Sequence, residues 1–393
     1  MAENLRATAT DGLLETNRRN RTRKRSTLAT LLAVLLVILA VLAIGFLTFL
    51  LHFNHPAHNR DCKKRVIGYY EDTDSVEIRV THIVFSHQFL SAKGTIEFKR
   101  HRTKFRFEKL RNKAKSCGLK VMISIGHELH SFLDNSTEFD RRCEFLNFIC
   151  ICILNFINCS KLTDSIVSFL EENQTAGVDL FWKWATTSNK SSYLLFVKEL
   201  RLKLLEKNKE YILSVTAAPK WIPNDWAVRF DLEDIIKHVD FMNIFSMDFF
   251  TPWEWQTGPT APLYHDIAPR ENFTVDYTMN YYACKLKEIS KLNLVTPMDA
   301  RIWRNVKTTL PGSEVFRNVE LVNGKEINPT IYKSRSLATE SGIKFDAAAW
   351  DEKTKTSYIF DETTRTFSSF ENKKSIEAKL NYVNEKHLGG VWI

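Results

Sequence analysis

Short apolar runs that alternate with helical patterns are the feature that most limits what this chain can fold into. The runs expected to form strands are 65–70, 81–86, 120–126, 175–184, 211–216, 239–245, 293–296 and 389–393. Between them, side chains recur at helical spacing, as Tyr193, Val197, Leu200 and Leu204 do. Strands joined by helices form a parallel sheet covered by helices, and eight such units predict an α/β fold of the (β/α)8 TIM barrel type.

Helix boundaries are expected at two further places. Residues 105–117 carry a helical pattern that Gly118 is expected to close, and Ser375 is expected to cap the last helix.

Residues 175–184, Thr-Ala-Gly-Val-Asp-Leu-Phe-Trp-Lys-Trp, differ from an ordinary parallel strand. Alternation places Asp179, Phe181 and Lys183 on one face, with apolar side chains on the other. Parallel strands are usually apolar on both faces, so the charges indicate a site inside the barrel. The alternative is that these three residues are only an inward layer of the barrel strand.

This stretch resembles the fourth strand of glycoside hydrolase family 18, the chitinases. The family pattern, Asp-Gly-x-Asp-x-Asp-x-Glu, ends in the acid that protonates the glycosidic oxygen. Ala176 stands at the first Asp, Asp179 at the second, Phe181 at the third and Lys183 at the Glu. By this resemblance, these are the degenerate catalytic positions.

The resemblance covers nearly all of residues 65–393. It implies a small α+β insertion domain at about 302–345, and it implies no metal or cofactor. Met247 replaces the tyrosine that hydrogen-bonds the N-acetyl carbonyl in the family, whereas Asp248 and Arg301 are retained. The ligand-binding candidates are Asp179, Met247, Asp248, Trp253, Arg301 and Trp303.

The substitutions remove what glycoside cleavage needs. The reaction requires a carboxyl group that donates a proton and then acts as a base. A lysine, with an ordinary pKa of about 10.4, supplies no carboxylate. We therefore expect an inactive chitinase-like protein, not an enzyme, whose cleft binds chitin or N-acetylglucosamine-containing glycans.

Two alternatives stay open at this point. One is an active hydrolase with a relocated acid, for which Glu128, Glu254 or Asp248 could serve. The other is a barrel that acts only as a scaffold for protein–protein interaction.

The positive charge of the chain is uneven. Of the formal net charge of +9, residues 1–25 hold seven Lys or Arg against three Asp or Glu, which leaves +5 for the rest. We interpret this excess as a membrane-topology signal and expect no nucleic-acid partner.

Residues 28–51 contain no charged side chain and are long enough to span a lipid bilayer. The expected order is a cytosolic basic tail (1–27), a transmembrane signal-anchor helix (28–52), a stem (53–63) and the barrel (64–393). The basic flank predicts a single-pass type II membrane protein with a lumenal or extracellular barrel.

Such a compartment makes sequons and cysteines informative. The glycosylation candidates are Asn135, Asn173, Asn189 and Asn272. Among seven cysteines, Cys62 and Cys117 are the candidate disulfide, with a buried thiol as the alternative for each.

Two segments depart from the family pattern. Residues 144–160 form an apolar run with one charged residue and no counterpart in the family, either an unspliced intron or a real insertion. Ile393 stops the eighth strand before the tryptophan that normally lies beneath the sugar in the family.

Overall fold

The computed structural model describes most of the chain after residue 63. The described residues are 64–70, 80–86, 88–90, 94–98, 100–126, 156–182, 190–220, 230–251, 255–266, 271–320, 332–333, 335–340 and 342–393. Residues 64–393 form one compact unit, to which all described residues belong. The predicted cytosolic tail, transmembrane segment and stem lie outside the described residues.

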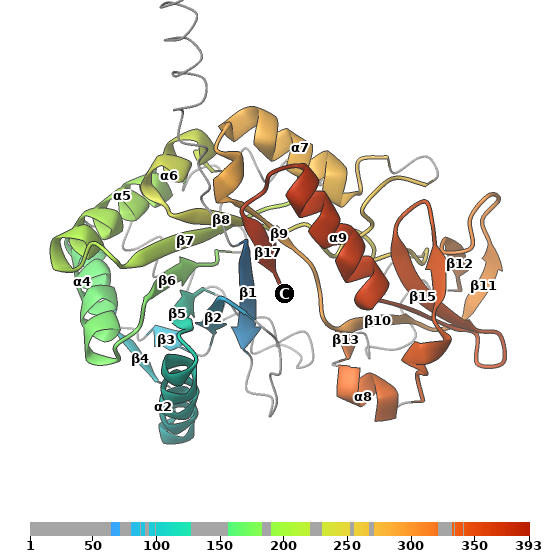
Figure 1. Ribbon diagram of the computed structural model, residues 1–393, viewed down its shortest axis with the longest axis horizontal. Coiled ribbons are helices and arrows are strands. Elements are labelled where there is room, and N and C mark those ends of the chain that lie inside the picture. The colour runs from blue at the N-terminus through green and yellow to red at the C-terminus, as the bar shows by residue number, and fades with distance from the viewer. Residues whose placement is uncertain are drawn as a thin grey trace, which may run out of the picture. The chain divides into compact units, whose positions relative to one another are not determined.

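Eight parallel strands close into a barrel (Figure 1). They are β1 (Arg65–Tyr70), β2 (His82–Phe85), β5 (Lys120–Ile125), β6 (Gly177–Leu180), β7 (Ile212–Ala217), β8 (Phe241–Ile244), β9 (Leu292–Val295) and β17 (Gly390–Trp392). The first strand pairs with β2 on one side and with β17 on the other, which closes the ring. The predicted barrel is confirmed, and each predicted strand is present.

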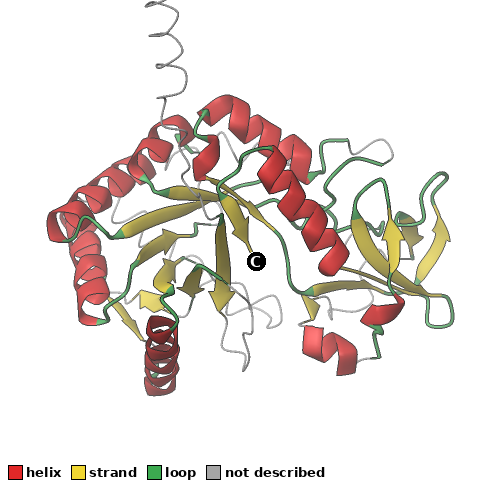
Figure 2. Ribbon diagram, viewed as in Figure 1, coloured by secondary structure: helices red, strands yellow, loops and turns green. Residues whose placement is uncertain are grey.

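Helices surround the barrel (Figure 2). They are α2 (His101–Ser116), α4 (Phe156–Glu172), α5 (Lys190–Lys207), α6 (Leu232–His238), α7 (Val275–Leu286) and α9 (Lys373–Glu385), with a short turn η4 (Ile289–Lys291) before β9. The predicted inner face of α5 is buried, including Tyr193, Leu200 and Leu204. Gly118 follows α2 with a φ of 68°, as its predicted closing role requires.

The N-cap of α9 differs from the prediction. Asn372 is the cap, and its side chain accepts a hydrogen bond from the backbone N–H of Ser375. Ser375 completes a capping box by accepting from the backbone N–H of Asn372. The helix therefore begins at Lys373, before the predicted start.

Helix α4 begins inside the predicted apolar insert, 144–160. Residues 156–160 form its first turns, and Lys203 of α5 donates to the carbonyl oxygen of Ser160 at 3.0 Å. Farther along the helix, the apolar side chains of Leu162 and Ile166 are buried. Residues 144–155 lie outside the described residues, so the choice between an intron and a real insertion stays a prediction.

The small domain is larger than the predicted 302–345. Its sheet has the order β13 (Tyr332–Lys333), β10 (Ala300–Trp303), β16 (Thr366–Phe370), β15 (Thr356–Asp361) and β14 (Ala349–Asp351). It also contains β11 (Val306–Thr309), β12 (Arg317–Val319), α8 (Arg335–Glu340) and η5 (Phe345–Ala347). A separate hairpin, β3 (Gln88–Leu90) and β4 (Ile96–Phe98), follows β2. The domain extends to Phe370. The prediction stopped short of this residue because β15 and β16 are rich in polar side chains and lack the apolar signal of a buried strand.

The predicted type II membrane localisation is corrected by the described structure. No helix among the described residues is long and apolar enough to cross a membrane. Even α5, with 18 residues, carries charged side chains along its length. The predicted segment 28–52 itself lies outside the described residues.

A buried histidine lies where β2 begins. His82 is 8% exposed, and its Nδ1 lies 2.8 Å from the hydroxyl of Thr81. Its ring meets Phe241 edge-on at 5.7 Å. Burial, helped by the charges of Lys120 and Arg65, lowers the pKa of His82 to about 4.

We predict that this histidine makes stability depend on pH. The unfolded chain takes up the proton near pH 6.5 and the folded chain only near pH 4, so stability is lost as the pH falls between them. The full loss is about 3 kcal/mol in the free energy of unfolding. Urea unfolding at pH 7 and pH 4.5 should show a smaller decrease for His82→Gln than for the unmodified chain. An equal decrease in the free energy of unfolding for both proteins would contradict the role given to His82.

Candidate functional site

Asp179 is a fully buried carboxylate at the centre of the barrel, with 0% of its surface exposed. Its Oδ1 accepts hydrogen bonds from Ser214 Oγ at 2.5 Å and Asn243 Nδ2 at 3.1 Å. Its Oδ2 accepts from the hydroxyls of Tyr69, Ser124 and Thr216, the last two at 3.4 and 3.5 Å. Five donors from four other strands thus converge on one side chain, and we call them with Asp179 the central network.

Strand register brings this network together. Ser124 of β5 pairs with Asp179 of β6, and Asp179 pairs with Ser214 of β7. Because alternate side chains point to the same face, residues in register point inward at one level. Gly177 lets β6 approach β7, since a Cβ there would lie 2.1 Å from the carbonyl oxygen of Ile212.

The network continues toward the beginning of the strands. Asn243 accepts from Asn293 Nδ2 at 2.9 Å, and Asn293 accepts from Arg65 Nε at 3.1 Å. Both asparagines are fully buried. The polar groups of these buried side chains therefore satisfy one another by hydrogen bonding.

The directions in which the pKa values of Asp179 and Tyr69 shift are consistent with a structural role for the central network. Burial raises the pKa of Asp179, against hydrogen bonds that lower it, chiefly that from Ser214. Burial and the neighbouring Asp179 raise the pKa of Tyr69 well above its ordinary value, which keeps the phenol protonated as a donor.

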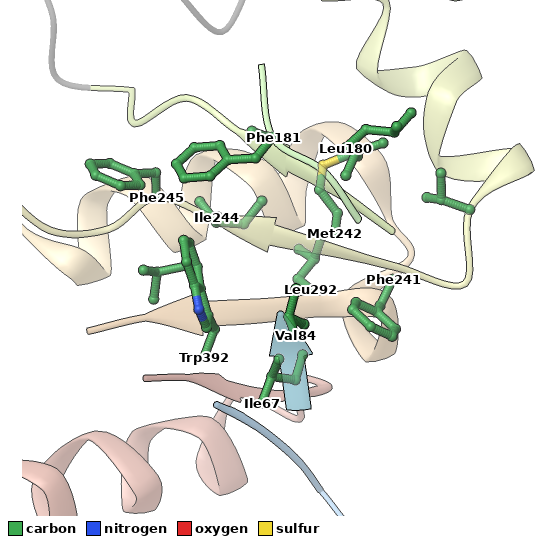
Figure 3. Packing of buried hydrophobic residues seen from close by; sticks show 14 of the residues in the cluster. Ile67, Val84, Leu180, Phe181, Phe241, Met242, Ile244, Phe245, Leu292 and Trp392 are labelled. Atoms are coloured by element: carbon green, nitrogen blue, oxygen red, sulfur yellow. The ribbon is translucent and has the colours of Figure 1, made fainter. Parts of the chain in front are cut away.

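Aromatic side chains fill the barrel beside the network. Phe181, Phe245 and Trp392 are 1%, 3% and 3% exposed, and Figure 3 shows them gathered in the core. The ring of Trp392 meets that of Phe181 edge-on, with 5.6 Å between the ring centroids. The centroid of Tyr69 lies 4.2 Å from that of Trp392, and the centroids of Phe181 and Phe245 are 6.0 Å apart. In this aromatic cluster, Phe181 is packed as a core residue.

The other degenerate positions add no acid among the described residues. Ala176 is partly buried against the core, and Met247 is 6% exposed. Lys183 lies outside the described residues.

Asp248 and Arg301 form an ion pair. Arg301 Nε and Nη2 lie 3.0 and 2.9 Å from the same oxygen, Oδ1, of Asp248. Arg301 is 2% exposed, and Thr260 also donates to that oxygen at 3.3 Å. The pair joins the segment after β8 to β10 of the small domain.

The tryptophan candidates have different surroundings. Trp303 is 1% exposed, donates from Nε1 to the carbonyl oxygen of Thr251 at 3.0 Å, and packs against Phe367. It is a core residue here, with no ring face presented to solvent. Trp255 is 53% exposed, while Trp253 lies outside the described residues.

Of the candidate glycosylation and disulfide residues, some lie among the described residues and others do not. Asn272 is exposed, whereas the amide of Asn173 donates to the carbonyl oxygen of Phe169 at 2.9 Å. Asn135 and Asn189 lie outside the described residues. Cys117 is a free, exposed thiol in the part of the chain that the structure describes. Cys62, its candidate disulfide partner, lies outside that part, so the pairing stays a prediction.

Within the described ranges, no group of three or more His, Cys, Asp or Glu could hold a metal ion. Sequence reasoning also missed most of the central network and the aromatic cluster. The available signal was alternation along neighbouring strands, which puts Ser124, Ser214 and Asn243 on the inward face.

Comparisons with known proteins agree with this architecture. The family model described as "Glycosyl hydrolases family 18" matches residues 65–393. Chitinase-3-like protein 2 of Homo sapiens is 24% identical over 300 residues, which cover 72% of this chain and 70% of that protein. Sporulation-specific chitinase 2 of Saccharomyces cerevisiae is 25% identical over 252 residues, 58% of this chain and 48% of that protein.

Solved structures show the same fold. A chitinase from Trichuris suis has a TM-score of 0.67 at 21% identity, covering 84% of this chain and 91% of that chain. A mutant class V chitinase from Nicotiana tobaccum in complex with NAG4 has a TM-score of 0.67 at 15% identity, covering 84% and 93%. With the barrel, the retained Asp179 and the family match over nearly all of the described structure, the chain belongs to family 18 of the glycosyl hydrolases.

Proposed function

We propose that this chain is a chitinase-like protein without hydrolytic activity, which binds chitin or N-acetylglucosamine-containing glycans at the C-terminal ends of its barrel strands. The observation that carries the proposal is the packing of Phe181 into the aromatic cluster. One position of the family's carboxylate pattern is thereby apolar core, 1% exposed.

The chemistry of the three positions supports inactivity. Lys183 replaces the acid and offers an ammonium group, which cannot return as the carboxylate base. Phe181 cannot hold an acetamido group by hydrogen bonding, and Met247 has no hydroxyl to donate. Asp179, the retained carboxylate, is occupied by five donors within the core.

A relocated acid finds little support among the described residues. Oδ1 of Asp248 is already engaged by two guanidinium nitrogens of Arg301 and by the hydroxyl of Thr260. Glu128 and Glu254, the other candidates, lie outside the described residues.

Glycan binding is supported by the family and by the exposed ring of Trp255. TIM barrels place their sites on the loops after the strands, and Trp255 follows β8 in one of these segments. The aromatic cluster occupies the centre, so a polymer would lie across the mouth of the barrel and contact its rim.

The first prediction from this proposal concerns catalysis. The unmodified chain should release no product from a chromogenic chito-oligosaccharide, and Lys183→Glu alone should not restore turnover, because Phe181 and Met247 still lack polar groups. The triple variant Phe181→Asp, Lys183→Glu and Met247→Tyr is the smallest set expected to act. An active family 18 chitinase is the positive control. Product formed by the unmodified chain, and absent from a mock purification, would contradict inactivity.

The second prediction concerns glycan binding. Trp255→Ala should weaken retention on chitin about ten-fold, a loss of about 1.4 kcal/mol, since stacking area is removed from an exposed site. Tyr277→Ala on α7, whose side chain is also exposed, is the matched control and should bind as the unmodified chain does. If neither the unmodified chain nor the Tyr277→Ala variant binds chitin, glycan binding is contradicted and the result favours the scaffold alternative.

The third prediction tests the structural role of Asp179. Asp179→Ala should lower the free energy of unfolding by about 3 kcal/mol, because several buried donors lose their acceptor. Asp179→Asn should cost less, since one oxygen remains and the hydroxyls can rotate. Glu362→Ala, at an exposed carboxylate, is the control in urea unfolding at pH 7. An Asp179→Ala variant as stable as that control would refute the role.

A further inference from the structure

Helix α5 carries apolar side chains on two opposite sides. One side, with Leu200 and Leu204, is buried against the barrel. On the other side, Leu195 and Leu202 are 65% and 63% exposed, more than any other large apolar side chain that the structure describes. They lie about two turns apart and so share one side of the helix, and Leu205, 38% exposed, lies beside them. We call Leu195, Leu202 and Leu205 the outer leucine face.

The outer leucine face lies between the two helices that flank α5. On the side of α4, Thr163 donates a hydrogen bond to Glu199 Oε1 at 3.0 Å. On the side of α6, Arg201 forms an ion pair at 3.0 Å with Asp240, which links α6 to β8. Figure 1 shows α4, α5 and α6 in succession around the outside of the barrel. The outer leucine face is therefore part of this exterior and is separate from the barrel mouth.

Opposite charges border the outer leucine face at the same height along α5. Glu199 lies toward α4, as its bond from that helix shows. Lys198 lies toward α6, because burial and then the charge of Lys198 lower the pKa of His238 on that helix. Both charges fall midway between Leu195 and Leu202. A surface with this arrangement is complementary to itself, which is what an interface between two identical copies requires.

We propose that the outer leucine face is the interface of a symmetric dimer of this chain, with its two-fold axis parallel to α5. This rotation places each leucine against its counterpart and brings the α4 side of one copy opposite the α6 side of the other. Lys198 then faces Glu199 of the second copy, between two pairs of leucines. An axis perpendicular to α5 would instead bring Lys198 against the same lysine of the second copy, which like charges disfavour.

A lipid surface fits the outer leucine face less well than a second copy does. Helices that lie on membranes carry cations beside their apolar side, and anionic lipids repel acids there. The exposed acids Asp164 and Glu206 border the outer leucine face together with Glu199. These carboxylates favour a protein partner that supplies cations.

The proposed dimer has a consequence for glycan binding. Strands β6 and β7 are parallel, so α5, which connects them, runs in the opposite direction along the barrel. A two-fold axis parallel to α5 therefore leaves both barrel mouths open on the same side of the dimer. Two sites on one side hold a polymer more strongly than one site does, through their effective concentration. This consequence rests on the proposed glycan binding, whereas the dimer itself does not.

The test is sedimentation equilibrium of the full chain, without glycan. The unmodified chain should dimerise, and Leu202→Glu should raise the dissociation constant about ten-fold or more, because a charge replaces an apolar contact at the interface. Phe105→Glu, at a 62% exposed position on α2, is the matched control and should associate as the unmodified chain does. Thermal melting checks that each variant is folded, and Leu202→Ser replaces Leu202→Glu if that variant is not.

Cross-linking tests the direction of the axis. With the axis parallel to α5, Leu202 of one copy lies opposite Leu202 of the other, so Leu202→Cys should give a disulfide-linked dimer on oxidation. Phe105→Cys is the control. It should cross-link no more than the unmodified chain, which already carries the exposed thiols of Cys117 and Cys284.

Three results would overturn the proposal. The first is a monomeric unmodified chain, and the second is a Leu202→Glu variant that associates as tightly as Phe105→Glu. The third is a disulfide within one chain between Leu202→Cys and Cys150 or Cys152, mapped by mass spectrometry, because residues 144–155 would then cover the outer leucine face. A monomeric chain that is still retained on chitin would leave the proposed function intact, so the two proposals fail separately.

Discussion

The fold depends on how one buried carboxylate is satisfied. Asp179 has no exposed surface, and burial without partners would cost several kcal/mol. Donors from β1, β5, β7 and β8 meet that requirement, and each must lie at the height of Asp179 in the barrel to do so. The same bonds that satisfy the carboxylate therefore fix the relative heights of five barrel strands.

Beside this network, the barrel interior has become an aromatic core. Phe181, Phe245, Trp392 and Tyr69 pack at ring distances between 4.2 and 6.5 Å. Such packing favours stability over chemistry, because a reaction centre needs polar groups and space for substrate. In our account the catalytic centre of the family has been replaced by packing, while the polar support for Asp179 persists as structure.

The sequence predicted the barrel well and its interior only in part. Apolar strands such as 65–70 and the motif around Asp179 carry strong local signals. By contrast, the aromatic cluster joins residues from opposite ends of the chain, Tyr69 and Trp392, whose contact depends on barrel closure. The hairpin of β15 and β16 was missed since its residues are mostly polar, and Asp248 and Arg301 were matched singly without indicating that they bind each other.

The most direct test of the central claim is a crystal structure of the chain soaked with a chito-oligosaccharide. Our account predicts sugar rings only at the rim of the barrel mouth, with Phe181 and Trp392 still in contact beneath them. An N-acetyl group seated against Asp179, with the aromatic cluster displaced, would contradict it.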